Sequence, residues 1–505
     1  MLGVHDTEQR GRDAVGLSVD MVTLPRIIGG LTWLTLSLLV ALLVAGEGWF
    51  LVAALLLAGG GALFAYRDLR GVTLLWILGM PSLLVFPNNL LASVPIVNAD
   101  RALWGLIVLS LLLRHLLKRD EPMGLMAIEK AMVLFALIIV VSLALRVTFR
   151  DHPLQRDDVI MAILGYAMPY ISFALARRQV WDEQALGLLL AGFTVVGVYN
   201  AVVGVLQSYF AVHLFDATYL EINNLGRGVG AFGGAWEFGG VLAVILLLTL
   251  LQYARARSRG RRLLCLAGAA ACAVGVAVSK TRGPWLATLL GLAVVYREDP
   301  RIRPLLRIGA ILAVVGAMVA FPFFVASDWW QRTTDVTSIY NRIALYATAA
   351  HMVLAHPLLG VGFARYGFAL PAPEYIVPVG GIGGEWAASV GVPHNELLHV
   401  VILTGLPGLI VDLTVLVLAY RLLAAAARRE HQEPEPIAEL ATYMKGAFVV
   451  VVTVGMFVDL GFSSYFTILF FFLLGLVSSP RRCRPDPAPV RASLAPPPTV
   501  VHASK

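Results

Sequence analysis

The chain has 505 residues, of which 58% are hydrophobic and 14% charged, and its mean hydropathy is +0.79. Because soluble domains carry roughly 25% charged residues, this composition excludes a set of soluble domains and predicts an integral membrane protein. The net charge of +7 follows the membrane-loop pattern described below, so it does not predict nucleic-acid binding. The three cysteines form no CxxC pair, which argues against a disulfide framework or a zinc site.

Apolar runs predict an all-α membrane protein when each is compared with the roughly 20 residues that span a bilayer as a helix. About 14 transmembrane helices are expected, within a range of about 12–14. The first seven are predicted near residues 27–45, 49–65, 71–86, 102–117, 128–147, 159–176 and 185–212. The other seven are predicted near residues 238–254, 263–279, 284–296, 308–326, 397–420, 446–461 and 464–479.

The basic residues indicate how these helices are oriented. Clusters such as Arg255 to Arg262 and Arg297 to Arg307 fall in alternate loops, and loops rich in Lys and Arg stay in the cytoplasm. Both termini are therefore predicted to be cytoplasmic. Residues 1–26 form an N-terminal cytoplasmic segment, 27–212 the first group of helices and 213–479 a transmembrane core. Residues 480–505 form a Pro-rich cytoplasmic tail, expected to be disordered.

Two predicted outward loops, at 213–237 and 327–396, are longer than a connection requires. In the second loop, Ile339, Ile343, Tyr346 and Ala350 recur at helical spacing. This pattern predicts an amphipathic helix over about residues 336–355, resting at the outer interface and ended by His356-Pro357.

Several polar residues at predicted outer helix ends are candidates for chemistry. His394 directly precedes the helix expected at 397–420, where a neutral imidazole can accept a proton from a hydroxyl; a capping interfacial histidine is the simpler alternative. Arg227 lies in a glycine-rich run, and glycine backbone N–H groups together with arginine suit a phosphate; a flexible loop with a solvated arginine would look the same. Asp459 is interpreted as an interfacial residue.

Three further cations are predicted to face outward, against the usual charge bias. Lys280 and Arg282 lie in a turn between two helices, and Arg342 lies on the amphipathic helix. Cations in such places call for an anionic partner, which a lipid headgroup or a nearby acid would also satisfy. The outward carboxylates show no metal-ligand spacing and no nucleotide-binding loop occurs, so no metal, no cofactor and no bound ATP are expected.

The motifs, taken in chain order, resemble the O-antigen ligase/polymerase family of envelope glycosyltransferases. The resemblance covers about residues 220–420. It rests on Arg227, on Ser279-Lys280-Thr281-Arg282-Gly283, on Arg342 followed by HPLLGVGF at 356–363, and on His394-Asn395 with Gly405 and Gly408 beyond it. One departure is Ala235-Trp236-Glu237, where the family often has Pro-Asn.

This resemblance implies a GT-C-like, metal-independent, inverting glycosyltransferase in the inner membrane of a bacterium, with an active site that faces the periplasm. The donor would be a glycan on a polyprenyl diphosphate, with the membrane lipids and polysaccharide assembly proteins as further partners. His394 would be the catalytic base, Arg227 and Arg282 would bind the diphosphate, and Lys280, Arg342 and Asn395 would support them. The acceptor would be a lipid A-core, as for a ligase, a second glycan, as for a repeat-unit polymerase of O-antigen or exopolysaccharide, or a protein. A lipid-linked oligosaccharide flippase or transporter and a scaffold protein are the alternatives from other classes.

Overall fold

The computed structural model describes residues 67–84, 99–117, 124–149, 154–212, 226–325, 337–365, 367–369, 371–377, 392–428, 436–462 and 465–479. Every regular element in these ranges is a helix, as the composition predicts. The helices expected at 27–45 and 49–65, the segment 1–26 and the tail 480–505 lie outside the described residues. So do parts of both long loops, namely 213–225, 326–336 and 378–391.

Most helices lie within a few residues of the predicted apolar runs, but the helix expected at 446–461 is α17, which begins ten residues earlier, at Pro436. The early ones are α3 (Leu69–Leu84), α4 (Ala99–Leu116), α5 (Ala127–Phe149), α6 (Arg156–Met161), which continues through a π-helical turn (Ala162–Ala167) into α7 (Met168–Arg178), and α8 (Glu183–Phe210). The middle ones are α9 (Ala235–Arg255), α10 (Arg259–Val278), α11 (Arg282–Glu298), the 3₁₀ turn η3 (Pro300–Ile302), α12 (Arg303–Val325) and α14 (Thr337–Ala355). The last are η4 (Ala372–Glu374), α16 (Glu396–Arg428), α17 (Pro436–Gly455), η6 (Leu460–Phe462) and α18 (Tyr465–Val477).

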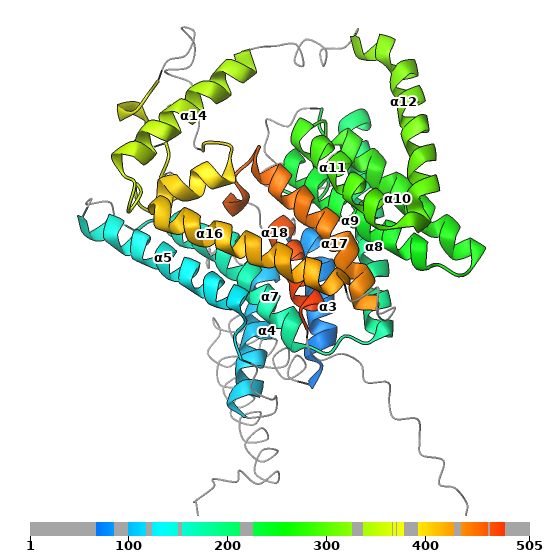
Figure 1. Ribbon diagram of the computed structural model, residues 1–505, viewed down its shortest axis with the longest axis horizontal. Coiled ribbons are helices and arrows are strands. Elements are labelled where there is room, and N and C mark those ends of the chain that lie inside the picture. The colour runs from blue at the N-terminus through cyan, green and yellow to red at the C-terminus, as the bar shows by residue number, and fades with distance from the viewer. Residues whose placement is uncertain are drawn as a thin grey trace, which may run out of the picture.

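Eight of the described helical segments have the length and apolar composition to cross a membrane, and α3 and α18 are shorter apolar helices. The protein is therefore a multi-pass membrane protein, and the part that the structure describes is all-helical. The expected amphipathic helix at 336–355 corresponds to α14, which lies beyond the bundle of long helices (Figure 1).

Helix α9 is the centre of the bundle. Its sequence is apolar on every side, as expected of a helix surrounded by protein, and nearly all its side chains from Ala235 to Gln252 are buried. It packs against α8, α10, α11, α17 and α18. Helix α12 is the opposite case, because exposed side chains such as Ile311 and Met318 cover it and it stands at the edge of the molecule (Figure 1).

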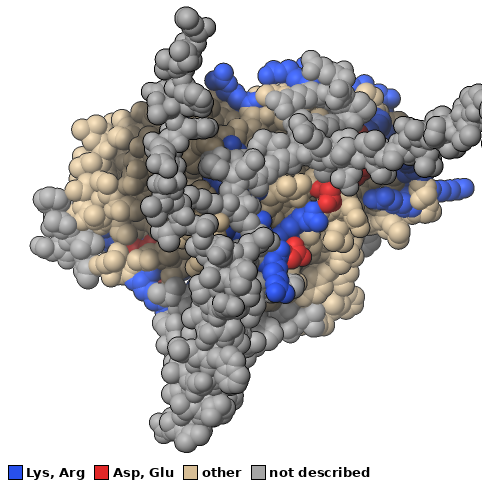
Figure 2. Space-filling model, turned by 90° about the horizontal axis from the view of Figure 1, so that it is seen from below, with Lys and Arg blue, Asp and Glu red and all other residues tan. Residues whose placement is uncertain are grey.

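Charged side chains gather at the ends of the helices. At one end, Arg177 and Arg178 bind Glu129, and Lys445 binds Glu298. Seen from below, basic side chains outnumber acidic ones, and acidic side chains lie directly against basic ones (Figure 2). These ion pairs join helix ends that the charge pattern assigns to the same side of the membrane.

Candidate active site

Two glycine motifs of the sequence, HPLLGVGF at 356–363 and Gly405 with Gly408, meet at a break in α16. Gly405 has φ 72° and ψ −175° inside this helix, a conformation that only glycine adopts readily. The segment after α14 runs across the break: Val361 N–H donates to the Ile402 carbonyl (2.7 Å) and Leu406 N–H to the Pro357 carbonyl (2.7 Å). These bonds satisfy backbone groups that the break frees, which is what permits non-helical backbone within a membrane helix.

The glycine-rich loop before α9 is held by two side chains of α8. Gln207 Oε1 accepts from the backbone N–H groups of Val229 (3.0 Å) and Gly230 (2.8 Å), while its Nε2 donates to the Gly230 carbonyl (2.9 Å). Asn200 Oδ1 accepts from the Ala231 N–H (2.9 Å). The loop carrying Arg227 is thus fixed to α8 by buried hydrogen bonds.

Lys280 ties this loop to the turn between α10 and α11. Its backbone has φ 48°, and its Nζ donates to the Gly226 carbonyl and lies 5.4 Å from the centroid of the Tyr209 ring. The residue next in sequence to that carbonyl is Arg227. Lys280 therefore acts in the structure as an anchor for the loop.

Asp459 holds the turn that contains His394. The His394 backbone has φ 52°, a left-handed conformation that is strained for a residue with a Cβ. Asp459 accepts from the N–H of His394 (3.0 Å) and of Asn395 (3.3 Å), and its side chain is almost fully buried. The sequence indicated only a residue near an outer helix end, whereas the structure shows a buried carboxylate that bonds a segment about 64 residues away in the chain.

Asn395 and Glu396 fix the start of α16. The Asn395 side chain accepts from the Leu398 N–H (3.2 Å), which caps the helix, and it donates to the Met456 carbonyl (3.4 Å). Glu396 accepts from the Tyr166 hydroxyl (3.1 Å) and from the backbone of η6. The geometry gives Asn395 a structural task, namely orienting the helix that follows the histidine.

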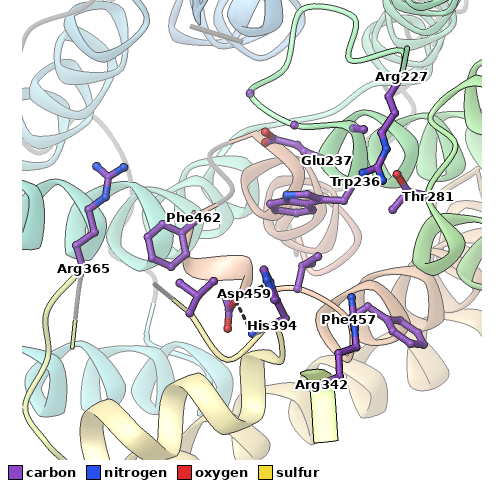
Figure 3. A pocket seen from close by; sticks show the side chains of 15 residues that line it. Arg227, Trp236, Glu237, Thr281, Arg342, Arg365, His394, Phe457, Asp459 and Phe462 are labelled. Atoms are coloured by element: carbon purple, nitrogen blue, oxygen red, sulfur yellow. Dashed lines mark hydrogen bonds and ion pairs between the residues drawn. The ribbon is translucent and has the colours of Figure 1, made fainter. Parts of the chain in front are cut away.

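These elements enclose a cavity of about 550 Å³. It is lined by Arg227, Gly233, Gly234, Ala235, Trp236, Glu237, Thr281, Arg342, Arg365, Val392, His394, Phe457, Val458, Asp459 and Phe462. Arg227 reaches down into the cavity from one side and Arg342 up from the other, with Trp236 and His394 between them (Figure 3).

The electrostatics of the cavity keep His394 neutral. Burial and, to a smaller extent, the Arg342 guanidinium lower the pKa of His394 to about 4. Its Nδ1 lies 3.9 Å from Asp459 Oδ2, too far for a hydrogen bond, and a neutral imidazole forms no ion pair with this carboxylate. Burial and the nearby Glu396 carboxylate raise the pKa of Asp459. A neutral imidazole 37% exposed to the cavity can accept a proton from a bound hydroxyl.

The predicted site residues divide into three groups. Arg227, Arg342 and His394 line one cavity although the sequence separates them widely. Lys280 and Asn395 lie beside it and hold its walls. Arg282, the first residue of α11, has an exposed side chain next to the cavity-lining Thr281, and its role as a diphosphate ligand stays a prediction.

Residues 267–412 match a family model described as O-antigen ligase. This part of the chain is similar to the O-antigen ligase family, and we call residues 267–412 the O-antigen ligase domain. No curated protein gives a significant match to the chain. The domain supplies Thr281, Arg342, Arg365, Val392 and His394 to the cavity, and it contains both glycine motifs that meet at the break in α16.

The rest of the cavity comes from outside the O-antigen ligase domain. Arg227, Trp236 and Glu237 precede it, and Asp459 and Phe462 follow it. Glu237, at the point where the sequence departs from the family pattern, is buried and accepts from the N–H groups of Tyr465 (3.0 Å) and Phe466 (3.4 Å). It caps α18, so the departure has a structural reason here. The one sequence signal for Asp459 was a carboxylate at the mouth of a helix.

Proposed function

We propose that this chain is a glycosyltransferase that moves a glycan from a polyprenyl diphosphate carrier to an acceptor hydroxyl at the outer face of a bacterial inner membrane. Its O-antigen ligase domain supports chemistry of the ligase and polymerase type. The observation that carries the proposal is the placement of His394, held in a left-handed turn by Asp459, in a cavity that Arg227 and Arg342 also enter.

The transfer is a displacement at the anomeric carbon. The acceptor oxygen bonds to this carbon while the bond to the diphosphate oxygen breaks, and the electron pair leaves with the diphosphate. The proton of the acceptor hydroxyl passes to a ring nitrogen of His394. Attack opposite the leaving group inverts the anomeric centre. Cleavage of the sugar–phosphate bond supplies the free energy, so the reaction needs no nucleotide.

The arginines stabilise the leaving group. Negative charge builds on the diphosphate as the bond breaks, and donors fixed in advance around that charge lower the barrier. Arg227 and Arg342 enter the cavity from opposite sides, and Arg282 begins the helix beside it. An arginine fork binds phosphate oxygens in pairs, which a lysine ammonium does not. In this scheme Asp459 is a positioning residue for His394, and Lys280 is a positioning residue for Arg227.

The test is reconstitution of the purified protein in liposomes with a polyprenyl-diphosphate-linked glycan, with and without a chelator. Lipid A-core, a second lipid-linked glycan and an acceptor protein are offered in parallel, and the wild type is compared with His394→Asn. Asparagine tolerates the left-handed backbone but does not act as the base, so the variant tests chemistry with the turn preserved.

Glycan transfer by the wild type in chelator, lost in His394→Asn, is the expected result. Transfer to lipid A-core makes the protein a ligase, whereas glycan elongation makes it a repeat-unit polymerase. Transfer that stops in chelator contradicts the metal-independent mechanism. Movement of the glycolipid across the bilayer with no acceptor modified contradicts the proposal as a whole and supports a flippase.

A further inference from the structure

A second cavity lies at the opposite end of α9 from the candidate active site. Its volume is about 760 Å³, and its walls are the ends of α8, α9, α10 and α17 together with η3. The active-site cavity includes Glu237 and the second cavity includes Gln252. At 1.5 Å per residue along a helix, the two are roughly 22 Å apart. The second cavity is therefore separate from the site that would bind the donor.

The walls of this cavity carry more positive than negative charge. Glu439 binds two of its arginines, Arg255 (3.3 Å) and Arg301 (2.7 Å), and Glu183 binds Arg255 as well (3.3 Å). These pairs join α8, α9, α17 and η3 and fix the shape of the recess.

Two further arginines of the cavity do not take part in these ion pairs. Arg257 and Arg261 line the cavity, are exposed, and form no ion pair with a residue in the described ranges. Four arginines face two glutamates in the lining, and one of the four, Arg301, also binds Asp299 (2.8 Å). The helices α8, α10 and α17 also begin at this cavity, and the N-terminus of a helix carries a partial positive charge. Both contributions favour an anion with phosphate oxygens.

The surroundings of the cavity indicate that this anion belongs to a lipid. Leu264 lies three residues after Arg261 on α10 and is 73% exposed, and Leu188 on α8 is 61% exposed. These side chains continue from the charged recess onto an apolar surface of membrane-spanning helices. An acyl chain can lie along that surface while its headgroup enters the recess, and basic residues at a membrane surface attract anionic lipids.

We propose that the cavity formed by Arg255, Arg257, Arg261 and Arg301 binds the phosphate headgroup of an anionic phospholipid. The charge pattern of the loops assigns this face to the cytoplasm. The site is independent of glycan transfer, and its occupant stabilises the packing of α8, α9, α10 and α17 against one another.

Binding is measured on the purified full-length protein in detergent, by native mass spectrometry and by the shift in melting temperature. Phosphatidylglycerol is compared with phosphatidylcholine and with inorganic pyrophosphate. The variant is Arg257→Gln/Arg261→Gln. Its control is Arg297→Gln/Arg428→Gln, which removes the same charge from exposed helix ends outside the cavity.

We expect phosphatidylglycerol to bind the wild type and raise its melting temperature. The cavity variant should bind about 30-fold more weakly, since it loses two arginines near an anionic headgroup, and the control should bind like the wild type. Substitution by lysine at both positions should restore part of the binding, which separates loss of charge from misfolding.

Three results overturn the proposal. Equal losses in the cavity and control variants show that only general surface charge matters. Equal binding of phosphatidylcholine shows that the headgroup charge is not recognised. Pyrophosphate that raises the melting temperature as much as the lipid identifies a soluble anion as the ligand. No glycan donor is present in these measurements, so their outcome is distinct from that of the transfer assay.

Discussion

At the scale of single residues, three non-glycine residues in the described ranges have positive φ. His394 lines the candidate active-site cavity, and Lys280 lies beside it. Such a conformation costs about 1–3 kcal/mol and persists where the surroundings hold it. Asp459 holds the first residue and the Gly226 carbonyl the second. The backbone strain at His394 therefore orients the imidazole, and the strain at Lys280 positions the side chain that holds the loop of Arg227.

Asp459→Asn should reduce transfer while leaving the protein folded. The two oxygens of Asp459 accept from two backbone N–H groups, whereas asparagine has one oxygen that accepts. The His394 turn should therefore shift, and a displacement of about 1 Å from a reacting geometry costs about 100-fold in rate. We expect kcat to fall by about that factor with the KM for the donor unchanged, because the arginines stay in place. Steady-state kinetics in liposomes measure both.

The control for this variant is Asp182→Asn. Asp182 caps α8 at the other end of the molecule by accepting from the Ala185 N–H, and asparagine caps helices equally well. It should transfer glycan at the wild-type rate. A KM that rises in Asp459→Asn while kcat stays constant would assign Asp459 to donor binding instead of to positioning His394.

Arg342→Gln should move the acid limb of the pH profile. The pKa of His394 is lowered to about 4, mainly by burial and in smaller part by the positive Arg342 guanidinium, which disfavours the imidazolium. Removing that charge raises this pKa, so His394 becomes protonated, and inactive as a base, at a higher pH. The profile of kcat/KM, which reports groups of the free enzyme, should show its acid limb at higher pH than in the wild type.

Arg365→Gln is the matched control, because Arg365 lines the same cavity and the change removes the same charge. Arg365 is paired with Asp157 and does not contribute to the shifted pKa of His394. Its variant should keep the wild-type position of the acid limb. An unmoved limb in Arg342→Gln would mean that another group sets the pH dependence.

At the scale of elements, the break in α16 explains why the two glycine motifs occur together. A Cβ on Gly405 would lie 2.3 Å from the Leu358 carbonyl oxygen, and one on Gly360 2.4 Å from the Ile402 carbonyl oxygen. Each motif leaves room for the backbone of the other. The first turns of α16, which follow His394, are thereby set apart from the membrane-spanning remainder.

Gly405→Ala should strongly reduce the amount of folded protein. The backbone conformation alone costs alanine about 1–3 kcal/mol, and the clash with backbone atoms adds to this cost. Gly316→Ala in α12 serves as the control, since a Cβ there meets nothing within 4 Å. Melting temperature and yield in detergent should fall for Gly405→Ala only. Equal behaviour of the two variants would contradict the structural role of the break.

The sequence predicted the helices well and their interruptions poorly. Helix positions follow from apolar runs of bilayer length, so α9 or α18 differs from its predicted range by only a few residues. The π turn at Ala162–Ala167 lies inside an apolar run without a charged residue. Gly405 and Pro407 interrupt the apolar run at 397–420, but the backbone groups that stabilise a break there belong to residues 357–361, which are distant in sequence. Asp459 was missed for the same reason, because its role exists only when it meets His394, 65 residues earlier in the chain.

At the scale of the whole molecule, the two cavities divide the protein into two chemically different ends joined by α9. The candidate active site gathers residues from before, within and after the O-antigen ligase domain, so residues 267–412 alone would lack Arg227 and Asp459. The opposite end gathers ion pairs and the lipid site. This polarity agrees with the loop charges, which assign His394 to the periplasm and Arg257 to the cytoplasm.

Single-cysteine labelling tests this assignment directly. Glu374 in η4 and Arg259 at the start of α10 are both exposed, and each is replaced by cysteine in a chain whose three native cysteines are alanine. In intact spheroplasts, a membrane-impermeant maleimide should label Glu374→Cys at once and Arg259→Cys only after the membrane is permeabilised. Labelling of both positions before permeabilisation, or in the reverse order, would place the two cavities differently across the membrane. The periplasmic reaction proposed for His394 would then be untenable, because a carrier glycan presented outside would not reach it.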